Sequence, residues 1–145
     1  MFKLTDDRLL RRQCYINGEW RKAAPGAAFA VTNPADGAVL AEVPDMGADE
    51  TAAAVAAAHA ALPGWRGRTA GERAVLLRRW FDLILTHQED LARLMTAEQG
   101  KPLPESRGEI AYAASFVEWF AEEGKRIFGD IIPAHRPDAP LVVIR

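Results

Sequence analysis

The stretch GEIAYAASFVEWFAEEGKRIFGD, residues 108–130, decides how the rest of this sequence can fold. It lies largely in a predicted helix from about Glu105 to Gly124, because apolar residues recur there with helical periodicity. One face of this helix is lined by Ile110, Ala113, Ala114, Val117, Phe120 and Ala121. Another face carries Tyr112, Phe116 and Trp119, spaced i, i+4 and i+7. Because both faces are apolar, we expect both to be buried, which requires more polypeptide than the surrounding elements supply.

Two further long helices are predicted before this one. The first begins near Asp49, whose carboxylate suits the positive end of a helix dipole, and ends at Pro63-Gly64. The second begins at Thr69, where Thr69-Ala70-Gly71-Glu72 has the spacing of a capping box. Its pattern weakens near His87, where a helix can kink, and resumes up to Gly100. The buried stripe of this second helix is expected to consist of Leu77, Trp80, Phe81 and Ile84.

Short strands are predicted at both ends of the sequence. Residues 14–16 and 19–21 form a hairpin through Asn17-Gly18, a pair typical of type I′ turns. A second hairpin joins residues 29–32 to residues 38–43 through a turn that contains Pro34 and Asp36-Gly37. Residues 141–145 read as a strand for which no partner strand is apparent. The predicted class is α/β: two short β-hairpins (14–43), three long helices (49–124) and a terminal strand.

Composition excludes several classes of function. The chain has 145 residues, 49% of them hydrophobic and 26% charged, as in an ordinary globular domain. A net charge of -2 argues against nucleic-acid binding. No apolar run approaches the roughly 20 residues of a membrane helix, so no membrane association is expected. The single cysteine, Cys14, cannot form an internal disulfide, which favours a cytoplasmic location.

Catalytic, cofactor-binding and metal-binding motifs are absent from the sequence. No glycine-rich phosphate loop is present. We interpret Cys14 as a small buried residue, since no base is placed beside it. His59, His87 and His135 lack a second metal ligand at a suitable spacing, so they are expected to be solvated or to cap helices. Another group is interpreted as a salt-bridged helix face: Glu118, Glu122, Glu123, Lys125 and Arg126.

The aromatic residues Tyr112, Phe116 and Trp119 admit two interpretations. Aromatic stripes at helical spacing mostly fill protein interiors, which favours core packing. The alternative is the wall of an apolar substrate channel that is completed by other polypeptide. The residues themselves leave both interpretations open.

Several stretches, in this order, resemble the start of aldehyde dehydrogenases. The likeness covers essentially the whole chain and is greatest to the bacterial succinate-semialdehyde dehydrogenases, with residues 108–130 the most specific part. It is carried by Tyr15–Trp20 (YINGEW), Val31–Pro34 (VTNP), Met46–Thr51 (MGADET), Leu94–Pro102 (LMTAEQGKP) and Trp119–Arg126 (WFAEEGKR).

The resemblance implies an oxidoreductase that oxidises an aldehyde with NAD or NADP, although the catalytic and cofactor-binding residues of that family match no position here. It implies that residues 1–140 are the N-terminal part of a cofactor-binding domain. Residues 141–145 would begin an arm through which subunits form a homo-oligomer, a dimer or tetramer. Tyr112 and Phe116 would border the substrate tunnel and are the site candidates.

Three readings of the whole chain follow. The first is the N-terminal fragment of a succinate-semialdehyde dehydrogenase, or of a dehydrogenase of another aldehyde. The second is a non-catalytic helical interaction module, and the third is an inactive remnant. The first is favoured by the order of the motifs. It predicts that the reading frame continues beyond Arg145 and that the 145 residues alone reduce neither NAD nor NADP.

Overall fold

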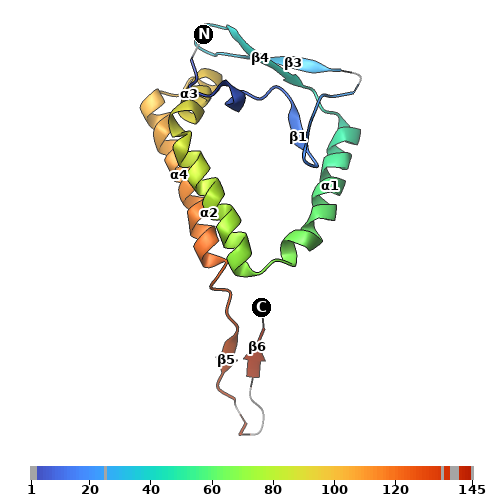
Figure 1. Cartoon of the computed structure of the whole chain (residues 1–145), viewed down its shortest axis with the longest axis vertical. Helices are drawn as coiled ribbons and strands as arrows, with labels where there is room; N and C mark the ends of the chain where they lie inside the picture. The colour runs from blue at the N-terminus through green and yellow to red at the C-terminus, as the bar shows by residue number, and fades with distance from the viewer. Residues whose placement is uncertain (1–2, 25, 135, 138–140, 145) are drawn as a thin grey trace.

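The computed structural model describes residues 3–24, 26–134, 136–137 and 141–144 (Figure 1). Within these ranges the chain forms four α-helices and three antiparallel strand pairs, which confirms the α/β class. A short 3-10 helix, Asp7–Leu9, precedes the first strand. No helix in the described ranges is long and apolar enough to cross a membrane.

The two predicted hairpins are confirmed. Strand β1 (Cys14–Ile16) pairs with β2 (Glu19–Arg21), and the turn between them has positive φ at Asn17 (52°) and Gly18 (80°). Both residues of a type I′ turn need positive φ, which asparagine and glycine tolerate best. Strand β3 (Ala28–Thr32) pairs with β4 (Val39–Pro44). The ends of both strands lie within one residue of the predicted ends.

Helix α1 (Ala48–Arg66) is longer than the sequence predicts. Pro63-Gly64, expected to end the helix, lies inside its last turns. The proline removes one backbone hydrogen bond, and the exposed position of this turn lets water satisfy the freed carbonyl. Gly47 is the N-cap residue of the helix, and its N–H donates to the Glu50 carboxylate at 3.0 Å. The same carboxylate accepts from the N–H of Ala24 and ties the loop after β2 to the start of α1.

The second predicted helix is two helices. Helix α2 (Ala70–Thr86) ends and α3 (Gln88–Gln99) begins at His87, whose φ of −103° and ψ of 15° interrupt the helix. His87 occupies the C-cap position of α2 and the N-cap position of α3, and its side chain makes no capping hydrogen bond to α3. Helix α3 ends at Gly100, which adopts the left-handed conformation with φ 76°.

The capping box at the start of α2 is confirmed. The N–H of Glu72 donates to the Thr69 hydroxyl at 3.2 Å, and the N–H of Thr69 donates to the Glu72 carboxylate at 2.8 Å. Replacing Thr69 with alanine is expected to lower the free energy of unfolding by about 1 kcal/mol. Thr86→Ala, which changes the same residue type at the other end of α2, should have a smaller effect. Urea unfolding of both variants measures the difference, and equal effects would contradict a specific role for the cap.

Helix α4 (Leu103–Glu123) packs on α2 and α3, and the alanines at these contacts form the centre of the core. Ala92, Ala114 and Ala121 are at most 1% exposed, so the helix axes approach closely. Only one face of α4 is buried within this chain, as expected for a helix whose two apolar faces need more polypeptide than the surrounding elements supply. Ala113 and Phe120, predicted to share a face with the buried Ala114 and Ala121, are themselves exposed, because α2 and α3 cover only one side.

The predicted stripe of α2 is buried in part. Leu77, Phe81 and Ile84 are half-buried against the neighbouring helices. Trp80, expected in the same stripe, is 57% exposed. The reason is its position: α4 contacts the side of α2 that carries Ala74 and Phe81, and Trp80 lies at the edge of that side.

The terminal strand has a partner, contrary to the sequence-based expectation. Strand β5 (Asp130–Ile132) pairs antiparallel with β6 (Leu141–Val143). The pair extends away from the helices and its residues are exposed (Figure 1). The partner was missed because the three residues of β5 are too few to show an alternation of apolar and polar side chains.

Candidate functional site

Helix α4 holds the two predicted site residues and is fixed at its N-terminal end. It begins after Pro102, and the buried hydroxyl of Ser106 lies 2.9 Å from the hydroxyl of Thr96 on α3. This hydrogen bond, between a buried and a half-buried hydroxyl, sets the position of one helix against the other. The face of α4 opposite its buried alanines is therefore held in a defined orientation.

That outward face carries a row of aromatic side chains. Tyr112 and Phe116 touch edge to face, with ring centroids 4.8 Å apart and an interplanar angle of 82°. Tyr112 is 65% exposed and Phe116 is 46% exposed. The structure thus brings the two site candidates together, one helical turn apart. Core packing within this chain is excluded for both of them.

The row extends further than the sequence indicates. Trp119 and Phe120 are also exposed, at 61% and 60%. From the sequence, Phe120 was expected on the face of Ala114 and Ala121, although its i, i+4 relation to Phe116 was a signal for this row. We call Tyr112, Phe116, Trp119 and Phe120 the aromatic row.

The carboxylates beside the aromatic row are paired with cations. Arg78 on α2 donates to Glu118 at 2.5 Å, which links α2 to α4. Glu122 pairs with Lys125 and Glu123 with Arg126, both at 2.6 Å. The hydrogen bond from Lys125 lowers the pKa of Glu122. This confirms the predicted salt-bridged face, and a carboxylate held as an anion in this way is a poor general base.

A shallow groove runs along the C-terminal half of the aromatic row. It is lined by residues between Ser115 and Arg126, all from α4 or the turn after it. A groove built by a single helix has no opposite wall. Its apolar floor can enclose a small molecule only when another element lies across it.

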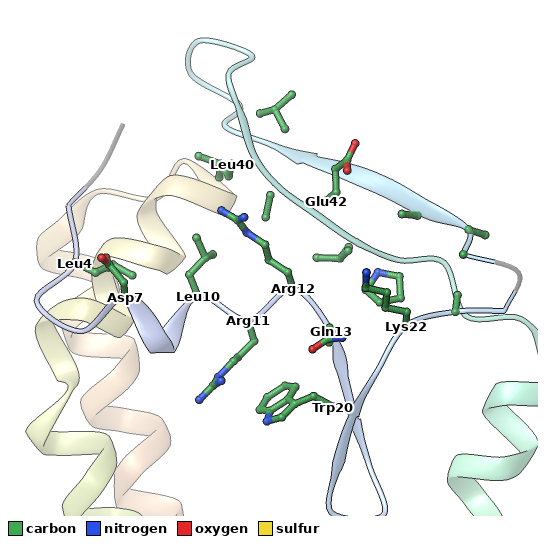
Figure 2. A pocket seen from close by; sticks show the side chains of 18 residues that line it. Leu4, Asp7, Leu10, Arg11, Arg12, Gln13, Trp20, Lys22, Leu40 and Glu42 are labelled. Carbon is green, nitrogen blue, oxygen red and sulfur yellow. The ribbon is translucent and has the colours of Figure 1, made fainter.

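A larger cavity, of about 1200 Å³, lies between the N-terminal segment and the β3–β4 hairpin (Figure 2). Leu4, Leu10 and Leu40 line its apolar end, and Arg12 extends toward the strand that carries Glu42. Arg11 turns away from these residues and stacks 4.6 Å above the ring of Trp20. The described lining residues combine neither a nucleophile with a base nor a set of metal ligands.

The remaining sequence candidates are dispersed. Cys14 is half-buried on β1 and free, and its predicted structural role stays a prediction. His59 is exposed on α1, as expected for a solvated histidine, and His135 lies outside the described residues. Across the described residues, no group of three His, Cys, Asp or Glu side chains is placed to hold a metal ion.

The starts of α1, α2 and α4 do not suit the pyrophosphate of a dinucleotide. This group typically binds the free N–H groups at the start of a helix. The starts of α1 and α2 are already occupied by the carboxylates of Glu50 and Glu72. At the start of α4, the N-cap residue Pro102 and the second helical residue Pro104 lack an N–H group. These helix starts therefore offer no site for NAD or NADP.

Comparison with known proteins gives these features a context. Residues 20–145 match the sequence profile of the aldehyde dehydrogenase family. The chain is 64% identical to a succinate-semialdehyde dehydrogenase [NADP(+)] of Escherichia coli, over 99% of this chain and 30% of that protein. It is 61% identical to a glutarate-semialdehyde dehydrogenase of Pseudomonas putida, with the same coverage. The crystal structure of a succinate-semialdehyde dehydrogenase from Burkholderia pseudomallei is 56% identical and superposes with a TM-score of 0.92 over 99% of this chain and 30% of that chain. The chain thus spans about 30% of the length of the relatives it matches.

Proposed function

Since the chain belongs to the aldehyde dehydrogenase family, we propose that it forms the N-terminal segment of an NAD(P)-dependent succinate-semialdehyde dehydrogenase, which oxidises succinate semialdehyde to succinate. The observation that carries the proposal is the aromatic row on α4. Its side chains are exposed in this chain, and two of them, Tyr112 and Phe116, are in edge-to-face contact. The row lies along a groove that lacks its second wall. Aromatic side chains in such a position suit the apolar wall of a substrate tunnel.

Within this enzyme, Tyr112 and Phe116 would line the tunnel and hold the carbon chain of the substrate. The cofactor would be bound by polypeptide outside this chain, because the helix starts described above are occupied or lack N–H groups. A nicotinamide cofactor held there would supply the hydride acceptor for the oxidation of the aldehyde. The contribution of this chain would be to position the substrate and to exclude water around it.

The semialdehyde of glutarate is the second candidate substrate. The identity to the glutarate-semialdehyde dehydrogenase of Pseudomonas putida, 61%, is close to the 64% identity to the Escherichia coli enzyme. The two substrates differ by one methylene group, which an apolar pocket discriminates by only about 10- to 200-fold. Both substrates therefore have to be compared directly.

The architecture of the parent enzyme is part of the proposal. Residues 1–140 would belong to its cofactor-binding domain, and residues 141–145, of which 145 lies outside the described residues, would start an oligomerisation arm. The exposed apolar strands β5 and β6 suit a contact between subunits of a homo-oligomer. The lone free thiol of Cys14 suits the reducing cytoplasm, where we place the enzyme.

A chimera tests the proposed function. This chain would replace the matching 143 residues of the Escherichia coli relative, and the formation of NADH and NADPH would be measured with each semialdehyde. We expect the chimera to oxidise succinate semialdehyde and the 145-residue chain alone to produce neither reduced cofactor. If a folded chimera prefers glutarate semialdehyde, glutarate semialdehyde is the substrate. If a folded chimera oxidises neither semialdehyde, the proposed function is wrong.

Two substitutions in the chimera test the tunnel. Tyr112→Ala and Phe116→Ala are each expected to lower kcat/KM for the semialdehyde about five- to tenfold, mainly by raising KM, because each removes apolar contact with the substrate chain. Tyr15→Ala and Phe29→Ala are matched controls, since these residues are similarly exposed but lie on the hairpins. Unchanged kinetics at both α4 positions would place the tunnel wall elsewhere.

A further inference from the structure

An ion pair lies at the N-terminal end of the aromatic row. Glu109 precedes Tyr112 by three residues and Phe116 by seven, so the three side chains follow one line along the surface of α4. Lys101, in the connection between α3 and α4, donates a hydrogen bond to the Glu109 carboxylate and forms an ion pair with it. Their side chains are 27% and 43% exposed, so water screens this pair only in part.

Lys101 occupies a connection whose backbone has little freedom. The preceding residue, Gly100, adopts φ 76°, a conformation that strains other residue types. A β-carbon at Gly100 would lie 2.9 Å from Cγ of Pro34, so the turn of the β3–β4 hairpin packs directly on this glycine. The following residue is Pro102, and a residue before proline is largely restricted to extended conformations. The Lys101 ammonium is therefore brought to Glu109 by a fixed backbone, which reduces the entropy lost in forming the pair.

The other carboxylates near the aromatic row are neutralised as well. Their partners are Arg78 for Glu118, Lys125 for Glu122 and Arg126 for Glu123. Of these four anions, Glu109 is the one within a helical turn of Tyr112. An aldehyde that carries a carboxylate would be repelled by an unpaired anion at this place, and the repulsion is strongest where water is excluded.

We propose that Lys101 determines specificity for aldehydes with an anionic far end, because it neutralises Glu109 beside the wall formed by Tyr112 and Phe116. The inference rests on the proposed function, since it requires the substrate to pass along that wall. Lys101 acts through Glu109 and does not itself contact the substrate. A pair that only fastened the start of α4 would affect all aldehydes alike, whereas a pair that removes a charge affects charged aldehydes alone.

Substitutions in the chimera distinguish these two roles. Butanal is the comparison substrate, because it has as many carbons as succinate semialdehyde and no charge. Lys101→Met is expected to lower kcat/KM for the semialdehyde about fivefold, mainly through KM, and kcat/KM for butanal less than twofold. The double variant Lys101→Met/Glu109→Gln removes both charges and should recover most of the loss. Lys101→Arg, which keeps the charge, should behave as the wild-type sequence does.

Two further measurements report on charge and not on folding. Salt screens repulsion, so the KM of Lys101→Met for the semialdehyde should fall toward that of the wild-type sequence between about 0.02 and about 0.5 M salt. Glu109→Gln alone leaves the Lys101 cation unpaired and should raise the preference for the semialdehyde over butanal, which keeps the test decisive if Lys101→Met does not fold. Arg21→Met is the matched control, because Arg21 also forms an exposed ion pair, with Glu19, but lies on β2. It should leave the preference unchanged.

The outcomes separate this inference from the proposed function. A loss that is selective for the semialdehyde, relieved by salt and reversed by Glu109→Gln supports the role of Lys101. Equal losses with both aldehydes, a loss that the double variant does not reverse, or unchanged kinetics would overturn it and leave the proposed function standing. If the chimera with the wild-type sequence oxidises butanal but not the semialdehyde, the proposed substrate and this inference are both wrong.

Discussion

Replacing Ala114 with leucine is expected to lower the free energy of unfolding of the chain by about 3 kcal/mol. Ala114 is completely buried on the side of α4 that packs on its neighbouring helices. Its small side chain allows the helices to approach closely, and a leucine would add three carbon atoms where no space exists. The helices would have to separate, which would also pull apart the hydroxyls of Ser106 and Thr96. The measurement is the midpoint of urea unfolding followed by circular dichroism.

The neighbouring residue provides the control. Ala113 is exposed on the same helix, so Ala113→Leu should change the free energy of unfolding by less than about 0.5 kcal/mol. Ala114→Val adds two carbons, so its loss of unfolding free energy should lie between those of the two leucine variants. If Ala114→Leu does not fold, Ala114→Val is compared with Ala113→Leu instead. Equal effects at residues 113 and 114 would mean that α4 is not packed as the structure shows.

This pair of alanines also illustrates what the sequence could predict. Periodicity located α4 and identified its apolar residues, but it placed Ala113, Ala114 and Phe120 on the same face. The buried residues Ala114 and Ala121 occupy a narrower face, and its direction depends on how α2 and α3 lie across α4. Periodicity identifies the apolar faces of a helix, whereas tertiary contacts decide whether a residue at the edge of a face is buried.

Turn and capping motifs were the sequence features that predicted local structure most reliably. Asn17-Gly18 formed the expected turn with positive φ, Thr69 and Glu72 formed the capping box, and Gly100 ended α3 in the left-handed conformation. The end of α1 was missed, because the helix continues through Pro63 and ends only at Arg66.

The candidate site was predictable only as a pair of residues. The i, i+4 spacing of Tyr112 and Phe116 placed them on one face of α4, and the structure shows them in contact. The ion pair of Arg78 with Glu118, 40 positions apart in the chain, was not predictable, because it depends on how α2 packs on α4. The attachment of the N-terminal segment to α3 was likewise not predictable from the sequence.

That attachment depends on one buried carboxylate. Asp90 on α3 is 4% exposed. Its oxygens accept from the N–H of Thr5 at 2.9 and 3.0 Å and from the N–H of Asp6 at 2.8 Å. Arg93, on the same helix, donates to the carbonyl of Lys3. These bonds hold the segment that contributes Leu4 and the residues after it to the cavity of Figure 2.

Replacing Asp90 with alanine is therefore expected to release the N-terminal segment. Hydrogen bonds to a charged group are each worth about 1.5–3 kcal/mol, so the amides of Thr5 and Asp6 should exchange with solvent roughly 100-fold faster. Hydrogen exchange measured by NMR gives these rates directly. Glu98→Ala is the control, because Glu98 is exposed on the same helix and is not among the residues that bond to the segment. Unchanged exchange at Thr5 and Asp6 in the Asp90 variant would show that the segment is held by other contacts.

The same anchor predicts a pH dependence whose sign follows from the charge. The N–H of Thr5, followed by the other donors, lowers the pKa of Asp90 in the folded chain below the ordinary value of 3.8. The folded state therefore favours the carboxylate, and the contribution of the anchor is complete above the unfolded pKa. It is lost as the pH falls through the lower folded-state pKa. Protection of the Thr5 and Asp6 amides, corrected for intrinsic exchange, should stay constant from neutral pH down to about 5 and fall in more acid solution. In Asp90→Asn, which cannot titrate, protection should be low throughout, and a pH-dependent loss in that variant would assign the titration to another group.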